Sequence, residues 1–283
     1  MTKRGATALA PRWTVPGGPA EASNDLEADL AASGERPVVA SSSSGRPSYV
    51  GPRASLPELE GSGDCFGVRI AQAGPERLSS WFDAAVGARG ICARTMVFAD
   101  TRTMNAAWDD EDLREILGRM DVVLRGGLGL DVYGALAGDA FREARGRAEL
   151  VLHLLASGPL RVFVYGGAPG VATEAARALE ARLPNVRVVG SQPARERATV
   201  IEEINEACAD VVLVGLGATR EARWIEESKV LLDVGVIVGV GDLLGELAGV
   251  PSRPSLVDRV TAGPTFLARA IAHLSVGVRP RGS

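Results

Sequence analysis

The spacing of apolar residues changes repeatedly along residues 61–274 of this chain. Short runs rich in Val, Ile and Leu alternate with longer segments in which apolar residues recur every three or four positions. The clearest runs are RVFVYGGAPG at 161–170 and ADVVLVGLG at 209–217, and each ends in a glycine turn. A helical pattern follows each turn, so the stretch predicts buried strands joined through helices.

The apolar runs predict strands at 66–70, 95–99, 120–124, 161–165, 186–189, 211–214 and 234–239. Helical spacing predicts helices at 75–85, 109–119, 148–156, 170–183, 198–208, 220–232 and 264–274, and one that ends at 137. Because strand and helix alternate, we expect an α/β fold, a Rossmann-like parallel sheet with helices on both faces. Right-handed crossovers then place every glycine turn at the carboxyl ends of the strands, where such sheets bind ligands.

Composition divides the chain into three parts. Residues 1–60 contain SSSSGRPS and many Pro, Gly and Ala residues with little periodicity, so we expect a disordered N-terminal tail. Residues 61–255 carry the α/β pattern, and residues 256–283 form a C-terminal helical segment.

Charge and cysteine usage exclude several classes of function. The formal net charge of −4 does not favour nucleic acid as a partner. Three scattered cysteines and two histidines without a CxxC pattern argue against a zinc site and against a disulfide framework. We therefore expect a cytoplasmic protein that uses no metal and no cofactor. No apolar run reaches the roughly 18 residues of a membrane-spanning helix.

Glycine follows four of the predicted strands, at 126–127, 166–167, 215–217 and 239–241. A strand that stops at glycine and leads into a helix leaves unpaired N–H groups at the helix start, and these favour a phosphate. The alternative is an ordinary packing turn, and one such turn alone is weak evidence. Neither GxxxxGK[ST] nor a GxGxxG with a downstream acid fits the chain, which argues against P-loop NTPases and dinucleotide enzymes.

Charged side chains follow several of these strands. Arg220 begins the helix after 215–217, where its guanidinium can pair with phosphate oxygens; a solvated helix face is the equal alternative. Asp100 and Asp242 each follow a strand, where a carboxylate can act as a base or hold a sugar hydroxyl. Helix capping is the alternative for both carboxylates, and for Asp242 it is slightly favoured.

Ordered motifs between Phe66 and Leu274 make this chain resemble the WecG/TagA/CpsF family of bacterial glycosyltransferases. The strongest match is DVVLVGLGA from Asp210, followed by RWI at 223–225. The remaining matches, in chain order around it, are FGVRI, DDEDLREIL, VFVYGGAPGVA, VVG, EEIN, GVG and LAG.

The resemblance implies an inverting transfer of a hexose or N-acetylhexosamine from a UDP-sugar to a polyprenyl-diphosphate-linked saccharide. This reaction contributes to exopolysaccharide and other cell-surface polymers, with the UDP-sugar as substrate and no metal motif. By the same resemblance, the residues that would line the donor crevice are Gly127, Gly129, Gly166, Gly167, Gly170, Gly215, Gly217, Arg220, Glu221, Gly239 and Gly241.

The resemblance also implies a location and an assembly. The protein would act peripherally at the inner face of the membrane and would self-associate, with Trp108 or Phe141 available for an interface. The C-terminal residues that would lie near the membrane are Arg259, Arg269, Arg279 and Arg281.

Several polar positions depart from the family pattern. Gly126 stands where the family's DGxG motif has its expected catalytic Asp, and Glu221 replaces the Gln of GxPKQExW. We place the base at Asp100 or Asp242 and prefer Asp100, because it neighbours the missing Asp in the expected sheet order. The alternative is a catalytically impaired relative that binds a nucleotide-sugar or serves as a partner subunit.

Overall fold

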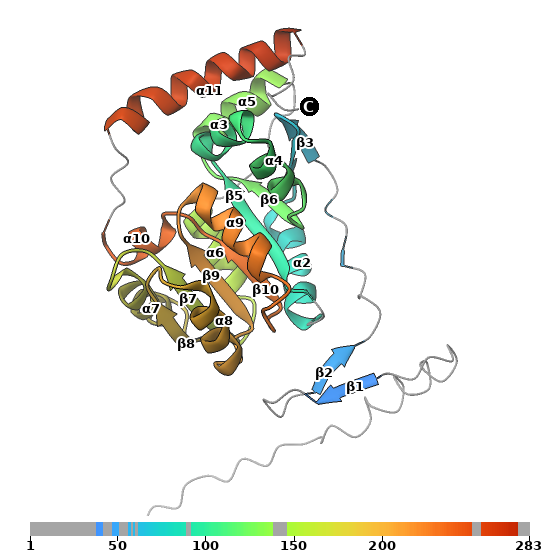
Figure 1. Ribbon diagram of the computed structural model, residues 1–283, viewed down its shortest axis with the longest axis vertical. Coiled ribbons are helices and arrows are strands. Elements are labelled where there is room, and N and C mark those ends of the chain that lie inside the picture. Colours follow the sequence, from blue (N-terminus) through green and yellow to red (C-terminus); the bar gives the residue numbers. More distant parts are fainter. Residues whose placement is uncertain are drawn as a thin grey trace, which may run out of the picture.

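The structure is a computed structural model that describes residues 38–41, 47–50, 56–57, 59, 62–88, 92–137, 146–250 and 256–276. It confirms the predicted α/β fold, with a parallel sheet between two layers of helices (Figure 1). Within the predicted tail, β1 (Val38–Ser41) and β2 (Pro47–Val50) pair antiparallel with each other, which the pattern did not predict. Most of that tail lies outside the described residues.

The central sheet has six parallel strands in the order β6-β5-β10-β9-β7-β8. Their bounds are β5 (Arg94–Ala99), β6 (Val122–Arg125), β7 (Leu160–Gly166), β8 (Val186–Gln192), β9 (Val211–Gly215) and β10 (Val236–Gly239). In chain order, β5 and β6 form one side of the sheet and β7 and β8 form the other. Strands β9 and β10 then lie between the two pairs. Residues distant in sequence therefore meet where β5 and β10 lie side by side.

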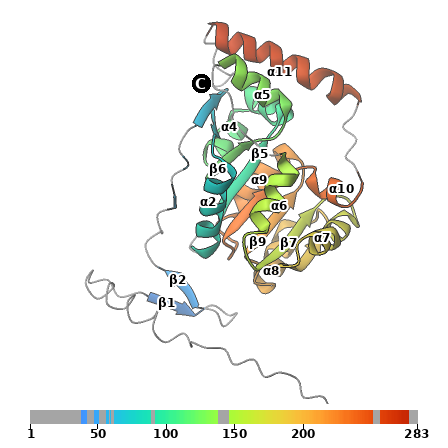
Figure 2. The same ribbon diagram turned by 180° about the vertical axis from the view of Figure 1, so that it is seen from behind.

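Side chains alternate between two cores along each strand. On β5, Met96 and Phe98 belong to one core, whereas Val97 and Ala99 belong to the other. The helices that bury the first core are α2 (Pro75–Gly87), α6 (Arg147–Leu155), α7 (Val171–Arg182) and α10 (Leu243–Leu247). Those of the second are α3 (Thr101–Asp109), α4 (Glu111–Gly118), α8 (Arg197–Glu206) and α9 (Ala218–Ser228) (Figures 1 and 2). Burial on both faces explains the continuous apolar runs of the sequence.

The helix predicted at 109–119 is confirmed as α4. Helix α3 precedes α4 as a separate helix that the pattern did not predict. Asp100 caps α3 by accepting the N–H of Thr103, and Asp110 caps α4 by accepting the N–H of Leu113. Two successive Asp caps therefore divide the segment into two short helices.

The strand predicted at 66–70 is β4 (Val68–Ala71), and it is not part of the parallel sheet. It pairs antiparallel with β3 (Ser62–Cys65) through a turn at Phe66 and Gly67. Phe66 has a positive φ of 55° and a fully buried side chain, so aromatic packing holds a backbone conformation that a bulky residue rarely adopts.

The last helix is longer than predicted. It is α11 (Leu256–Val276), and Pro264, which the prediction took as its start, lies inside it. Figure 2 shows α11 beside α5 (Leu128–Ala137) at one end of the molecule. Helix α11 packs on α3 and on α5, next to the carboxyl ends of β5 and β6.

Candidate active site at the carboxyl edge of the sheet

The four glycine turns lie at one edge of the sheet, as the parallel topology requires. Three of them follow the consecutive strands β10, β9 and β7, and the fourth follows β6. Asp100 follows β5, between β6 and β10, so it lies within the same row of strand ends. The edge thus gathers the predicted glycines and both predicted carboxylates.

Three of the glycines are required by close packing. A Cβ on Gly166 would overlap the carbonyl oxygen of Gly215, and a Cβ on Gly239 would overlap the carboxylate of Glu221. A Cβ on Gly215 would lie 2.6 Å from Cδ1 of Leu244. At these positions the structure supports the packing turn that the sequence left open as an alternative.

Gly167, predicted to line the donor crevice, does not offer a free N–H group. Its N–H donates to the carbonyl oxygen of Gly215 at 2.9 Å, so the turn after β7 is tied to the end of β9. Gly129 is likewise a close-approach position, because a Cβ there would overlap Cγ2 of Thr101 on α3. Gly167 therefore shapes the edge through a backbone hydrogen bond, and Gly129 through its close approach to a side chain of α3.

A different group of glycines borders open space. Gly127, Gly170 and Gly217 have positive φ values of 151°, 89° and 83°, and a Cβ on any of them would meet no atom of the described residues within 4 Å. Gly170 is the N-cap of α7 and Gly217 is the N-cap of α9. These are the glycines beside which a ligand has room to approach two helix starts, where the helix dipole favours an anion.

Asp100 caps the start of α3 at this edge. Its Oδ1 accepts the N–H and the hydroxyl of Thr103, each at 2.9 Å, in a capping box that starts α3. Its Oδ2 accepts two N–H groups of Arg102, each at 3.2 Å. Both carboxylate oxygens are therefore occupied, and the capping alternative describes this residue.

Asp242 differs from Asp100, although it also precedes a helix. It is the N-cap residue of α10, but its side chain makes no capping hydrogen bond. Its Oδ2 accepts Nη2 of Arg102 at 2.9 Å, and its Oδ1 accepts no hydrogen bond among the described residues. Arg102 thus joins the two predicted carboxylates across the ends of β5 and β10.

Arg102 was not singled out from the sequence. It stands in the first turn of α3, and its guanidinium is the cation between Asp100 and Asp242. Both hydrogen bonds favour the charged form and raise the pKa of Arg102. Within the described part of the chain, no three His, Cys, Asp or Glu residues are grouped to hold a metal ion.

Glu221 lies beneath the turn that carries Asp242. Its side chain is buried in α9, with only 2% of the residue exposed, and its Oε2 accepts the N–H of Gly241 at 2.9 Å. Burial raises the pKa of Glu221 to about 8 against its two backbone hydrogen bonds. The structure therefore places Glu221 under the β10–α10 turn, whereas Arg220 is exposed at the start of α9.

The C-terminal helix docks on the domain through aromatic side chains. Phe266 and His273 of α11 lie with ring centroids 5.4 Å and 5.6 Å from that of Phe66. Arg269 forms an ion pair with Asp109 at 2.7 Å and lies over the ring of Trp108. Arg269 is therefore held against α3 rather than projecting as a free cation, and Trp108 is buried in the same cluster.

The other predicted C-terminal and interface residues have no described side chains. Arg279, Arg281 and Phe141 lie outside the described residues, and the side chain of Arg259 is also outside them. Asp131 lies in the first turn of α5 and pairs with Arg125.

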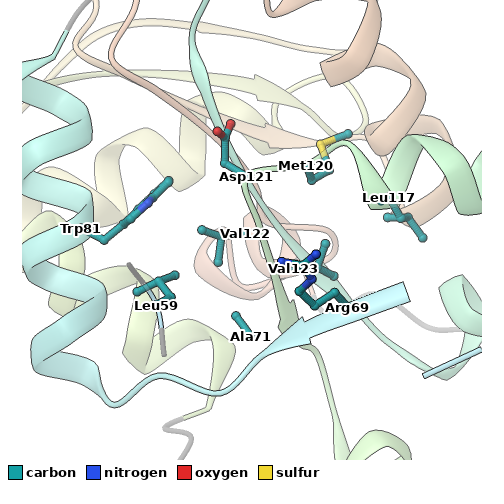
Figure 3. Close-up of a pocket in the computed structure, with 10 residues that line it drawn as sticks. Leu59, Arg69, Ala71, Trp81, Leu117, Met120, Asp121, Val122 and Val123 are labelled. Atoms are coloured by element: carbon teal, nitrogen blue, oxygen red, sulfur yellow. The ribbon is translucent and has the colours of Figure 1, made fainter. Parts of the chain in front are cut away.

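A cavity of about 470 Å³ lies elsewhere, beside the edge strand β6 (Figure 3). The residues that line it are Leu59, Arg69, Ala71, Trp81, Leu117, Gly118, Met120, Asp121, Val122 and Val123. Asp121, at the amino end of β6, has its oxygens occupied by Arg94 and by the N–H and hydroxyl of Thr95. The cavity thus reaches the end of the strand opposite to the glycine turns, and the chemistry-bearing residues point to the carboxyl edge instead.

Known proteins similar to this chain agree on its family. The sequence model described as "Glycosyl transferase WecG/TagA/CpsF family" matches residues 64–263. The N-acetylglucosaminyldiphosphoundecaprenol N-acetyl-beta-D-mannosaminyltransferase of Bacillus subtilis (strain 168) is 24% identical over 161 residues, which are 55% of this chain and 63% of that protein. The chain thus spans less than two thirds of that relative's length. Because the family match runs from β3 into α11 and includes the whole carboxyl-edge cluster, this chain belongs to the WecG/TagA/CpsF family of glycosyltransferases.

Proposed function

We propose that this protein is an inverting glycosyltransferase that moves a hexose or N-acetylhexosamine from a UDP-sugar to a polyprenyl-diphosphate-linked saccharide. The observation that carries the proposal is the Asp100–Arg102–Asp242 cluster beside glycine turns that border open space. Family membership supports glycosyl transfer, and the name of the Bacillus subtilis relative includes a lipid-diphosphate acceptor. A role in the synthesis of a cell-surface polysaccharide follows from such an acceptor.

The chemical step needs a base at the acceptor hydroxyl. In an inverting transfer, the hydroxyl oxygen forms a bond to the anomeric carbon while the bond from that carbon to the diphosphate oxygen breaks. The base takes the hydroxyl proton, and UDP leaves with the bonding electron pair. We assign the base to Asp242 instead of Asp100, because Asp242 has an oxygen that accepts no hydrogen bond from any described residue, while Asp100 caps α3.

The leaving diphosphate needs positive charge. The starts of α7 and α9 face the edge beside Gly170 and Gly217, and aligned peptide dipoles there stabilise negative charge. Arg220, exposed in the first turn of α9, adds a guanidinium at the same place. These groups support the assignment of the donor crevice to the ends of β7 and β9.

The proposed acceptor has a lipid tail embedded in a membrane, so the enzyme must contact the membrane surface to reach it. Among the described residues, each helix is too short or too polar to span a bilayer. Apolar side chains are nevertheless exposed on the neighbouring helices α5 and α11: Val132, Leu136, Leu267, Ile271 and Leu274. We propose that this α5–α11 stripe rests on the inner membrane face, as amphipathic helices do at a lipid interface.

A second candidate function is nucleotide-sugar binding without turnover. Gly126 occupies the position of the family's expected catalytic Asp, and a Cβ there would lie 2.9 Å from the carbonyl oxygen of Ala99. The backbone is therefore built around a glycine at this position. A chain that has lost this carboxylate and gained no other base would bind its donor without transferring the sugar.

One experiment separates the two functions. The full chain is incubated with UDP-hexoses or UDP-N-acetylhexosamines and a synthetic lipid-diphosphate saccharide, while calorimetry measures UDP binding. Transfer with inversion supports the enzyme, and UDP binding without transfer or donor hydrolysis supports the binding protein. Absence of both UDP binding and turnover with every donor would overturn both functions.

A further inference from the structure

Arg147 places a second guanidinium at the carboxyl edge. It is the first residue of α6, which leads into β7, so the start of this helix lies at the same edge as the glycine turns. A Cβ on Gly241 would lie 3.0 Å from Nη1 of Arg147. The guanidinium therefore lies against the β10–α10 turn, close to the space that a side chain at residue 241 would occupy.

The hydrogen bonding of Arg147 is incomplete. Only 19% of its side chain is exposed, and its buried Nε has no hydrogen-bond partner in the described part of the chain. Its ion pair there is a long contact of 3.5 Å to Glu246, whose side chain is 49% exposed. An arginine stays protonated in a protein, so a buried N–H without an acceptor is unfavourable until a ligand supplies one.

Arg102 and Arg147 lie on the two sides of the same turn. Arg102 pairs with Asp242, whereas Arg147 contacts Gly241, the residue before it. The two guanidinium groups come from α3 and α6, on opposite faces of the sheet. A group with several anionic oxygens is the ligand that suits such fork-shaped donors.

We propose that Arg147 binds the diphosphate of a substrate. In the absence of that diphosphate, Glu246 pairs with the guanidinium of Arg147. The proposal rests on the proposed function for the identity of the substrate, since the UDP-sugar and the lipid-linked acceptor both carry a diphosphate. The carboxylate of Glu246 can turn to solvent at little cost, because it is half exposed and its contact is long. Arg147 then exchanges a weak internal partner for a charge-assisted fork to phosphate oxygens.

The test measures binding to the full chain by calorimetry with three probes: UDP, inorganic diphosphate and a short polyprenyl diphosphate in detergent. Arg147→Gln should weaken binding by about 10- to 100-fold, the size of a charge-assisted hydrogen bond or pair of bonds. Glu246→Gln should tighten binding by about 3- to 10-fold, because a competing carboxylate is removed.

A matched pair of variants controls for net charge. Glu115 and Arg119 on α4 form a contact of 3.4 Å, similar to that of Glu246 and Arg147, but near the amino end of β6. Glu115→Gln and Arg119→Gln change the same charges and should leave binding unchanged. Equal effects of the two Glu variants, or of the two Arg variants, would assign the result to bulk charge and overturn the proposal.

The outcomes also separate this inference from the proposed function. If the wild-type chain transfers sugar and Arg147→Gln binds every probe as tightly as wild type, the inference alone is overturned. If the wild type neither binds a probe nor turns over, both fail. A loss confined to UDP assigns Arg147 to the donor, and a loss confined to the polyprenyl probe assigns it to the acceptor. If Arg147→Gln does not fold, Arg147→Lys, which keeps the charge but loses the fork, should still bind more weakly than wild type.

Discussion

The carboxylate of Glu221 accepts the N–H of Gly241 at 2.9 Å, directly beneath the turn that presents Asp242. Gly239 leaves room for that carboxylate, since a Cβ there would overlap it. A buried side chain of α9 thus fixes the end of β10, and the end of β10 fixes the position of the proposed base. The protonation of Glu221 should therefore affect the stability of the fold as well as the position of Asp242.

Glu221→Gln should make the protein more stable at high pH. Burial raises the pKa of Glu221 from an ordinary value of 4.5 to about 8, so the folded chain holds this proton more tightly than the unfolded chain. The stability due to Glu221 is therefore full below pH 4.5 and is lost as the pH rises toward 8. At 1.36 kcal/mol per pKa unit, the gain of the variant at pH 9 is up to about 5 kcal/mol.

Urea unfolding of the wild type and of Glu221→Gln at pH 5, 7 and 9 checks this prediction. The two proteins should have similar stability at pH 5 and diverge as the pH rises. Glu202→Gln, on the exposed surface of α8, is the control and should show no such divergence. A difference between Glu221→Gln and wild type that is the same at every pH would contradict the buried, protonated carboxyl.

Asp242→Asn should abolish most of the transfer activity without unfolding the protein. The amide keeps a hydrogen bond to Arg102 but cannot take a proton from the acceptor hydroxyl, and the loss of a general base typically lowers the rate by 10²–10⁴-fold. Initial rates at saturating donor, together with thermal unfolding, measure both effects. Wild-type rates in this variant would remove Asp242 from the chemical step.

Asp100 should instead prove to be mainly a capping residue. Asp100→Ala removes the acceptor for the N–H of Thr103 and should cost about 1 kcal/mol of stability, as the loss of an N-cap does. Asp100→Asn retains a capping side chain, so we expect it to fold normally and to keep its activity within about tenfold of wild type. A larger rate loss in Asp100→Asn than in Asp242→Asn would return the base to Asp100.

Introducing an Asp at position 126, where the resemblance leads us to expect the family's catalytic Asp, should not raise the transfer rate. A Cβ at Gly126 would lie 2.9 Å from the carbonyl oxygen of Ala99 and 3.1 Å from its carbon, and neither backbone atom can move alone. The N–H of Gly126 also donates to that oxygen at 2.6 Å. We expect Gly126→Asp to lower stability by about 1–3 kcal/mol, as overpacking does, with no gain in transfer rate. A faster enzyme of unchanged thermal stability would show that this backbone adapts readily.

The sheet and its carboxyl edge could be predicted from the sequence because two physical rules determine them. Strands buried on two faces must be continuously apolar, and parallel strands must end together, so periodicity alone located the glycine turns. The cluster at that edge was harder to predict. Arg102 and Asp242 are 140 residues apart, and they meet only because β10 inserts beside β5.

Glu221 shows what a charge pattern conceals. The segment TREARWIEES alternates charges as a solvated helix does, so the sequence favoured an exposed or ligand-facing Glu221. The structure buries Glu221 with Trp224, Ile225 and Ser228, which follow it at helical spacing. Trp224 and Ile225 follow Glu221 by three and four positions, so their helical spacing predicts that the Glu221 carboxylate lies on the inner face of the helix.

The α5–α11 stripe should bind lipid surfaces through its apolar side chains. Leu267 and Ile271 lie one helical turn apart on α11, and 42% and 52% of these residues are exposed, so each can enter a bilayer interface. The double variant Leu267→Gln, Ile271→Gln should co-sediment less with vesicles that contain anionic lipid, while its thermal stability stays near that of wild type. Leu231→Gln is the matched control, because Leu231 is 53% exposed beyond the end of α9, away from α11. If wild type and the double variant bind vesicles equally, the stripe is not the surface that contacts the lipid of the proposed acceptor. If the double variant and Leu231→Gln lose vesicle binding equally, the binding is nonspecific adsorption.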